Sequence, residues 1–237
     1  YEAVRLMQKA YEELFKKQLK DDEFTKVLNR YELEHNRIDR MGSRSLEFSV
    51  GLAYLEAKLY EQSFNHLINA YKQYKRASRS PELLFGLGVA MDESGRDDDA
   101  VKLFESFTRR FKKNPVRVEA FRRAGEIFRG KKAYAKASKK YKQAFGASKT
   151  HLEKGQILME HARVFDSKED FSTAAGLREK AVREIALAKG ENYDTLTLAY
   201  KELGQNYVRL EQFVKSAQAF DKALNFSRDD REKASLG

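Results

Sequence analysis

The 237-residue sequence contains no cysteine and no tryptophan, only two prolines, and no apolar run near the roughly 20 residues that a membrane-spanning helix needs. Without cysteine the chain can form neither disulfides nor thiolate metal sites, and the redox compartment stays undetermined. Few prolines, 13 glycines and 35% charged residues favour a helical protein over a disordered or all-β one. The chain starts at Tyr1 without a signal-like segment. We therefore expect a fragment or a processed form, and the sequence assigns no cellular compartment.

Catalytic motifs are also missing. The sequence has no HExxH zinc motif, no GxSxG nucleophile elbow, no Walker phosphate loop and no Cys–His pair. His161 has no second ligand at helical spacing, so we expect a core histidine. Asp97–Asp99 could bind a cation, but solvation and the dipole of the following helix explain three acids at that place. We expect no enzymatic activity, no cofactor and no metal site.

A repeat becomes visible when five small residues are aligned, and we name them the Gly column: Gly51, Gly88, Gly125, Ala162 and Gly204. The first three intervals are 37 residues each and the last is 42. Twelve residues after each member stands a small column, and sixteen residues after it a large column. The small column is Ser63, Ala100, Ala137, Ala174 and Ser216, and the large column is Leu67, Phe104, Tyr141, Arg178 and Phe220.

The chemistry of these columns predicts pairs of antiparallel helices. Large residues such as Leu84 and Phe121 stand four residues before the glycines, on the same helix face. A glycine inside a helix costs about 1 kcal/mol relative to alanine, so four at one column indicate close helix approach. We expect the small column, for example Ala137, to meet the Gly column. We expect the head of Arg178, the exception in the large column, to reach water while its stem covers apolar surface.

These residues resemble the tetratricopeptide repeat. The resemblance is carried by Leu84, Leu87, Gly88, Ala100 and Phe104, and by Phe121, Ala124, Gly125, Phe128, Ala137, Tyr141 and Ala144. It implies an all-α fold, a right-handed α-solenoid of antiparallel helix pairs, and binding of a peptide or protein in a concave groove. The period of 37 is longer than the usual 34 residues, and the family's Lys/Asn carboxylate clamp is not reproduced.

The predicted organisation follows from the columns. Residues 1–41 form an N-terminal helical pair, a degenerate or upstream repeat, with helices over Glu2–Leu19 and Glu23–Asp39. Residues 44–226 form five repeats, and residues 228–237 start a further helix. The five repeats span residues 44–77, 81–114, 118–148, 155–189 and 197–226.

We call the two members of each helix pair its first and second helix. The resemblance maps the groove onto a face of the first helices that lies away from their core-facing stripe. The expected partner-binding residues are Phe48, Leu52, Leu55, Phe85, Val89, Arg122, Arg129, Arg163, Lys201 and Gln205. This groove would be apolar at its start and basic from its middle on. Alternatively, Phe48, Leu52 and Phe85 pack against the N-terminal helices.

Charge narrows the class of partner. The formal net charge is +10, and residues 109–142 hold 14 lysines and arginines but only two acids, Glu119 and Glu126. An outer basic patch is expected at Lys136, Lys139 and Lys140. Such a field attracts an acidic protein segment, although a solvated surface explains it too. We expect a scaffold that binds a peptide or protein and aids assembly of a complex. The alternatives are a basic adaptor for nucleic acid or an anionic membrane surface, and self-association through open ends.

Overall fold

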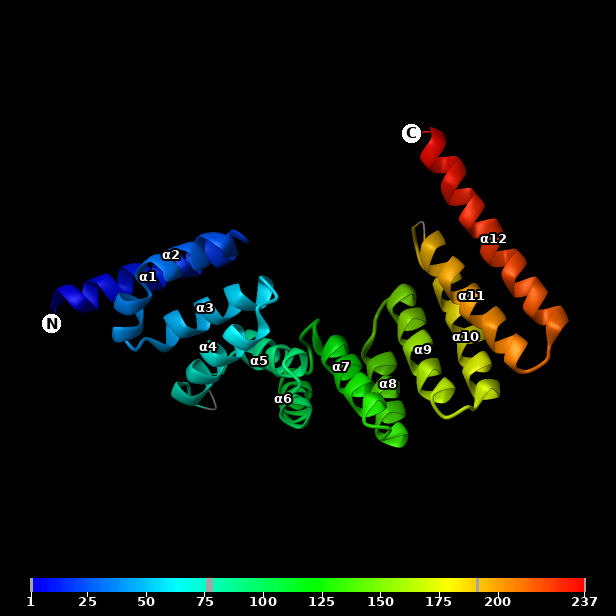
Figure 1. The fold of residues 1–237 in the computed structure, drawn as a ribbon, viewed down its shortest axis with the longest axis horizontal. Coiled ribbons are helices and arrows are strands. Elements are labelled where there is room, and N and C mark those ends of the chain that lie inside the picture. The colour runs from blue at the N-terminus through cyan, green and yellow to red at the C-terminus, as the bar shows by residue number, and fades with distance from the viewer. Residues whose placement is uncertain (1, 76–78, 191, 237) are drawn as a thin grey trace. The chain divides into compact units, whose positions relative to one another are not determined.

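The computed structural model describes residues 2–75, 79–190 and 192–236, and over these residues it holds twelve helices and no strand (Figure 1). The chain divides into two compact units, residues 1–114 and 115–237, which are described separately. In the described part of the chain, no helix is both long and apolar enough to cross a membrane. The fold is therefore all-α, as the sequence predicts.

Within the described residues, each unit contains six helices. In the first they are α1 (Glu2–Lys20), α2 (Phe24–Arg40), α3 (Arg44–Glu56), α4 (Tyr60–Gln73), α5 (Pro81–Glu93) and α6 (Asp97–Arg110). In the second they are α7 (Arg117–Gly130), α8 (Tyr134–Ala147), α9 (His151–Asp166), α10 (Phe171–Ala186), α11 (Tyr193–Arg209) and α12 (Phe213–Leu236). Within each unit, each helix packs against the next. The grouping of these helices into five repeats over residues 44–226 stays a prediction.

Several helix ends differ from expectation. α9 begins at His151, earlier than the expected 155, because the Thr150 hydroxyl caps it by accepting a bond from the Glu153 N–H at 3.2 Å. α11 begins at Tyr193 instead of 197. The expected separate helix at 228–237 is wrong for the described residues, since α12 continues unbroken to Leu236 without glycine or proline. Expected ends at residues 1, 76–77 and 237 lie outside the described residues.

Five turns share one backbone geometry. The residue seven positions after each Gly-column member has a left-handed φ between 57° and 75°: Lys58, Gly95, Lys132, Glu169 and Glu211. The N–H of the residue after it donates to the carbonyl five positions back, at 2.8–2.9 Å, which closes each first helix with a Schellman-type cap. The α1–α2 turn repeats this at Asp22 (φ 56°). We infer that α1 and α2 form a hairpin of the same type, with Phe15 at the place of the glycine.

The Gly column meets the large column through the space that each glycine leaves and the small column through its backbone, while the contact expected for Ala137 stays a prediction. A Cβ at Gly88 would lie 2.7 Å from Phe104 Cε1, and one at Gly125 would lie 3.1 Å from the Tyr141 ring. Equivalent contacts join Gly51 to Leu67 and Gly204 to Phe220. The small column instead reaches the backbone: the hydroxyls of Ser63 and Ser216 donate to the carbonyls of Gly51 and Gly204 at 2.9 and 3.0 Å. A large side chain therefore occupies the space that each glycine leaves.

Two substitutions test this packing. Gly88→Ala pushes a methyl group into the fully buried Phe104 ring, and we expect a loss of about 1–3 kcal/mol in the free energy of unfolding. Gly176→Ala, inside α10, meets nothing within 4 Å, and we expect a gain of about 0.5–1 kcal/mol from helix propensity. Urea unfolding followed by circular dichroism measures both. Equal effects of the two substitutions would contradict the close contact.

Candidate functional site

The apolar residues expected in the groove lie mainly between helices. Leu52 and Leu55 of α3 approach α5, where a Cβ at Gly86 would lie 3.3 and 3.2 Å from their Cδ2 atoms. The Phe85 ring lies 6.0 and 5.6 Å from the rings of Phe104 and Phe107 in α6. Val89 is buried at 7% exposure and Phe48 is half-buried. Leu52 and Leu55 thus pack against α5, and Phe85 packs against α6. A binding role for these residues stays a prediction.

The arginines expected to make the groove basic are ion-paired. Arg122 Nε donates to Glu160 Oε2 at 2.9 Å, and Arg122 Nη1 lies 3.0 Å from Glu119 Oε2. Arg163 Nη2 donates to Glu202 Oε1 at 2.9 Å. The bond to Glu160 raises the pKa of Arg122 further above its ordinary value. Successive first helices of the second unit are thus joined by paired charges.

Arg129 is paired in the same way. Its Nε donates to Glu126 Oε2 at 3.0 Å, and its Nη1 approaches the Ser167 hydroxyl at 3.5 Å. The hydrogen bond from Arg129 lowers the pKa of the Glu126 carboxyl. Tyr141 Oη also donates to Glu126, at 3.1 Å. With the two other arginines, Arg129 forms a neutralised surface where the sequence predicts a basic one.

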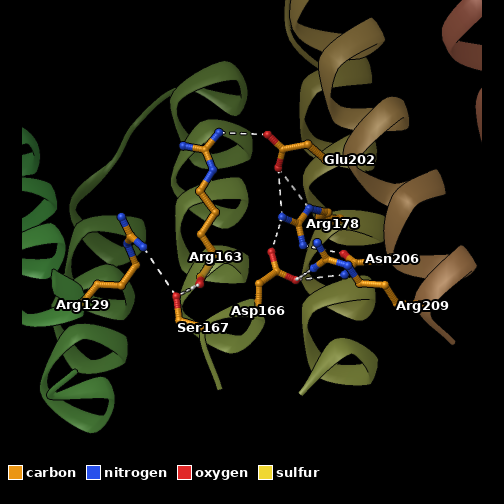
Figure 2. A network of polar contacts seen from close by, with 8 residues as sticks. All are labelled: Arg129, Arg163, Asp166, Ser167, Arg178, Glu202, Asn206 and Arg209. Carbon is orange, nitrogen blue, oxygen red and sulfur yellow. Dashed lines mark hydrogen bonds and ion pairs between the residues drawn. The ribbon is translucent and has the colours of Figure 1, made fainter. Parts of the chain in front are cut away.

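Arg178 is the centre of a buried polar network (Figure 2). Its side chain is 4% exposed, so the expectation that its head reaches water is wrong. Nη2 donates to Asp166 Oδ2 at 2.6 Å and Nε to Glu202 Oε2 at 3.1 Å, while Nη1 donates to Asn206 Oδ1. Asn206 Nδ2 donates back to Asp166 Oδ1 at 2.9 Å. The network joins α9, α10 and α11 because each buried charge and amide finds a partner there.

His161 is the core histidine that the sequence predicts. It is 5% exposed, and its ring packs against the rings of Tyr141 and Phe165 at 6.0 and 5.4 Å. Its Nε2 lies 2.6 Å from Ser138 Oγ. Burial, helped by the charge of Lys142, lowers its pKa to about 4. In the described chain no acidic side chain is hydrogen-bonded to this ring, so the pair lacks the orienting acid of a catalytic triad.

An exposed stripe of side chains lies along α11, the first helix of its pair. Leu198, Lys201, Gln205 and Val208 of α11 stand at spacings of three, four and three residues, on one face. Leu198 and Val208 are 49% and 47% exposed, and the two polar residues are exposed as well. The sequence predicts Lys201 and Gln205 as binding residues. Leu198 was missed, although its place three residues before Lys201 is the signal that finds it.

A basic cavity opens at the start of α8, beside the expected outer basic patch. The patch residues Lys136 and Lys139 are exposed and Lys140 is half-buried. The cavity has a volume of about 580 Å³, and we name it the α8–α9 pocket. Its walls are Lys132, Ala133, Tyr134, Ala135, Lys136, Ser138, Val164, Phe165 and Lys168. Sequence reasoning found Lys136 but missed Lys132 and Lys168, because they come together only when α9 packs on α8.

The Arg178 network gives a prediction on stability. Arg178→Met leaves the part-buried carboxylates of Asp166 and Glu202 without their shared cation, and we expect a loss of about 3 kcal/mol in the free energy of unfolding. Adding Asp166→Asn and Glu202→Gln removes the uncompensated charges and should recover part of it. Arg163→Met, at a side chain 46% exposed, is the control and should cost less than about 1 kcal/mol. If Arg178→Met lowers the free energy of unfolding no more than Arg163→Met does, the network does not stabilise the fold as proposed.

His161 gives a pH-dependent prediction. Between pH 6.5, the ordinary histidine pKa, and about 4, the unfolded chain takes up a proton that the folded protein does not. Stability is therefore complete above about pH 6.5 and falls as the pH drops, by up to about 3 kcal/mol from this residue. Urea unfolding from neutral to acid pH should show a flatter pH dependence in His161→Gln than in wild type. His151→Gln, at an exposed histidine, is the control for the substitution itself. Identical pH profiles for wild type and His161→Gln contradict the prediction.

No protein-family model and no curated protein matches the sequence. Solved structures do. The C-terminal part of a TPR repeat-containing protein from Cytophaga hutchinsonii has a TM-score of 0.68 at 12% identity, covering 94% of this chain and 80% of that one. MamA from Desulfovibrio magneticus RS-1, from residue 41 to its end, has a TM-score of 0.61 at 18% identity and covers 78% and 96%. BtubC (BKLC) from P. vanneervenii has a TM-score of 0.64 at 15% identity and covers 92% of each chain. The chain therefore has a tetratricopeptide-like helical-repeat fold.

Proposed function

We propose that this chain is a protein-interaction scaffold without a catalytic role, which holds a peptide or protein partner and aids assembly of a larger complex. The observation that carries the proposal is the α11 stripe of Leu198, Lys201, Gln205 and Val208. Two half-exposed apolar side chains flank two polar ones on a single helix face. Aligned apolar anchors with polar neighbours are typical of helix-mediated contacts.

The surroundings of α11 support a rigid binding surface. α11 packs against both α10 and α12, and its inner side chains Leu196, Ala199 and Leu203 are buried. Asn206, one residue beyond the stripe member Gln205, belongs to the Arg178 network. The stripe is thereby held in one orientation, which lowers the ordering cost of binding. Among the described residues, no group of three or more His, Cys, Asp or Glu side chains is placed to hold a metal ion.

An affinity experiment with the full chain as bait tests the proposal. Lys201→Glu/Val208→Ser changes the charge and the apolar anchor of the stripe. We expect the partner recovered by wild type to fall at least about fivefold, because anchors of this kind dominate binding energy. Leu187→Ser/Lys189→Glu makes a similar chemical change at exposed positions just after α10 and is the matched control. Recovery that is equal with the stripe variant and the control would count against the stripe.

The same experiment separates the alternatives. Nuclease-sensitive material, lost when Lys136 and Lys139 are reversed in charge, would favour the basic adaptor for nucleic acid. Recovery of only the protein's own chain would favour self-association. The apolar residues exposed on α12 support that second alternative: Phe213, Val214, Phe220 and Leu224. Reversal of Arg122, Arg129 and Arg163 is unsuitable as a test, because it breaks the ion pairs by which Arg122 and Arg163 join successive first helices.

A further inference from the structure

The α8–α9 pocket is held open by contacts between its two walls. Tyr134 Oη, at the first residue of α8, donates to the carbonyl of Ser167, just after α9, at 2.9 Å. The floor is apolar: Val164 is fully buried and Phe165 is half-buried. Ala133 and Ala135 contribute only methyl groups, which leaves the cavity unfilled. A rigid pocket of this size accepts one large side chain of a ligand.

Three lysines surround the pocket, and none is neutralised. Lys132, Lys136 and Lys168 are exposed, and in the described part of the chain no carboxylate lies within ion-pair distance of them. Lys136 Nζ lies 5.5 Å from the centroid of the Phe128 ring, and Lys168 Nζ lies 5.4 Å from that of Phe165. The hydrogen bonds from Thr173, helped by the charge of Lys168, lower the pKa of the Asp170 carboxyl, without an ion pair between Lys168 and Asp170. The nearby acids do not line the pocket; Asp170 caps α10 by accepting a bond from Thr173 N at 3.1 Å.

The equivalent position in the first unit carries a carboxylate of its own. Glu61 stands ten residues after Gly51, as Ala135 stands ten residues after Gly125. Glu61 Oε1 pairs with Arg96 Nη2 at 2.7 Å. At the equivalent position the second unit has Ala135, so α8 supplies no carboxylate there. Asp170 stands at the position of Arg96, eight residues after the Gly-column member, and it caps α10, so α8 brings no carboxylate to the three lysines of the α8–α9 pocket.

We propose that the α8–α9 pocket binds an acidic peptide segment, whose carboxylates meet Lys132, Lys136 and Lys168 while one apolar side chain enters between Tyr134 and Phe165. This rests on the proposed function and adds to it a second contact site with a defined chemistry. A nucleic acid fits less well, because a phosphate backbone needs a continuous basic track. The lysines are confined to the α8–α9 pocket, and the acids Glu169 and Asp170 directly follow Lys168.

The test measures binding of a rhodamine-labelled peptide, Asp-Glu-Phe-Asp-Glu, to the full chain by fluorescence anisotropy at about 0.1 M salt, where exposed charges still attract. We expect a Kd of roughly 10–100 µM for a ligand of this size. The uncharged peptide Asn-Gln-Phe-Asn-Gln and the peptide Asp-Glu-Ser-Asp-Glu should each bind at least about tenfold more weakly. Neutral and acidic peptides of equal affinity would overturn the proposal.

Variants locate the site. Lys136→Glu/Lys168→Glu should weaken binding of the acidic peptide at least tenfold, a change of about 1.4 kcal/mol or more. Lys139→Glu/Lys149→Glu changes the net charge equally at exposed residues that do not line the pocket, and should weaken binding less than about threefold. Ala135→Glu places a carboxylate where Glu61 stands and should weaken binding more than Ala135→Gln, which has the same size without charge. Circular dichroism and urea unfolding confirm that each variant is folded.

The outcomes keep this inference apart from the proposed function. If peptide binding responds to Lys201→Glu/Val208→Ser and not to the pocket variants, the pocket is the wrong site and the scaffold proposal stands. If the pocket variants alone reduce peptide binding, the pocket is the site, whatever the affinity experiment with the α11 stripe gives. If a single-stranded oligothymidine displaces the peptide at lower concentration than unlabelled peptide does, the acidic-peptide assignment is overturned in favour of nucleic acid.

Discussion

The contact of one large side chain with the helical glycine of its partner helix is the constraint on which the helix pairs depend. Each glycine costs about 1 kcal/mol of helix propensity, and burial of Leu67, Phe104 or Tyr141 against it offsets that cost several-fold. The spacing of sixteen residues is fixed because the turn between the two helices has one geometry throughout. In the fourth pair both partners change together: Ala162 replaces the glycine and Arg178 replaces the large apolar residue.

The paired replacement at Ala162 and Arg178 allows a different kind of contact between the helices. Ala162 adds a buried methyl group where the other members of the Gly column are glycines, and Arg178 turns its guanidinium to acceptors on α9 and α11. A planar guanidinium with five donors can satisfy several acceptors at once, which a lysine cannot do with the same geometry. Glu202 accepts from both Arg163 and Arg178, so the ion pair between first helices and the buried network share one carboxylate. The packing columns and the charge pairs thus specify the same arrangement of α9, α10 and α11.

The sequence predicts the helices and the columns well because both follow from local periodicity. It fails where a contact joins residues about one repeat apart, since nothing local marks that Arg122 meets Glu160, 38 positions later. Left-handed turn residues were also missed: lysine and glutamate at φ near +60° carry no conformational signal of their own, and only Gly95 does. The pocket was missed for a related reason. Ala135 stands at the position that Glu61 has in the first repeat, ten residues after the Gly column. The sequence does not show that Glu61 forms an ion pair with Arg96, so the absence of a carboxylate at Ala135 goes unnoticed.

In the basic block between residues 109 and 142, arginines and lysines behave differently. Its arginines at 122 and 129 form geometrically matched pairs with glutamates, and their charge is cancelled at short range. Its lysines at 132, 136 and 139 remain exposed, where hydration suits an ammonium better than a fixed partner does. The lysines around the start of α8 therefore contribute charge that no short-range ion pair cancels. A field attracts an anionic partner without orienting it, whereas a cavity with an apolar floor inside that field can fix one side chain, and the α8–α9 pocket combines the two.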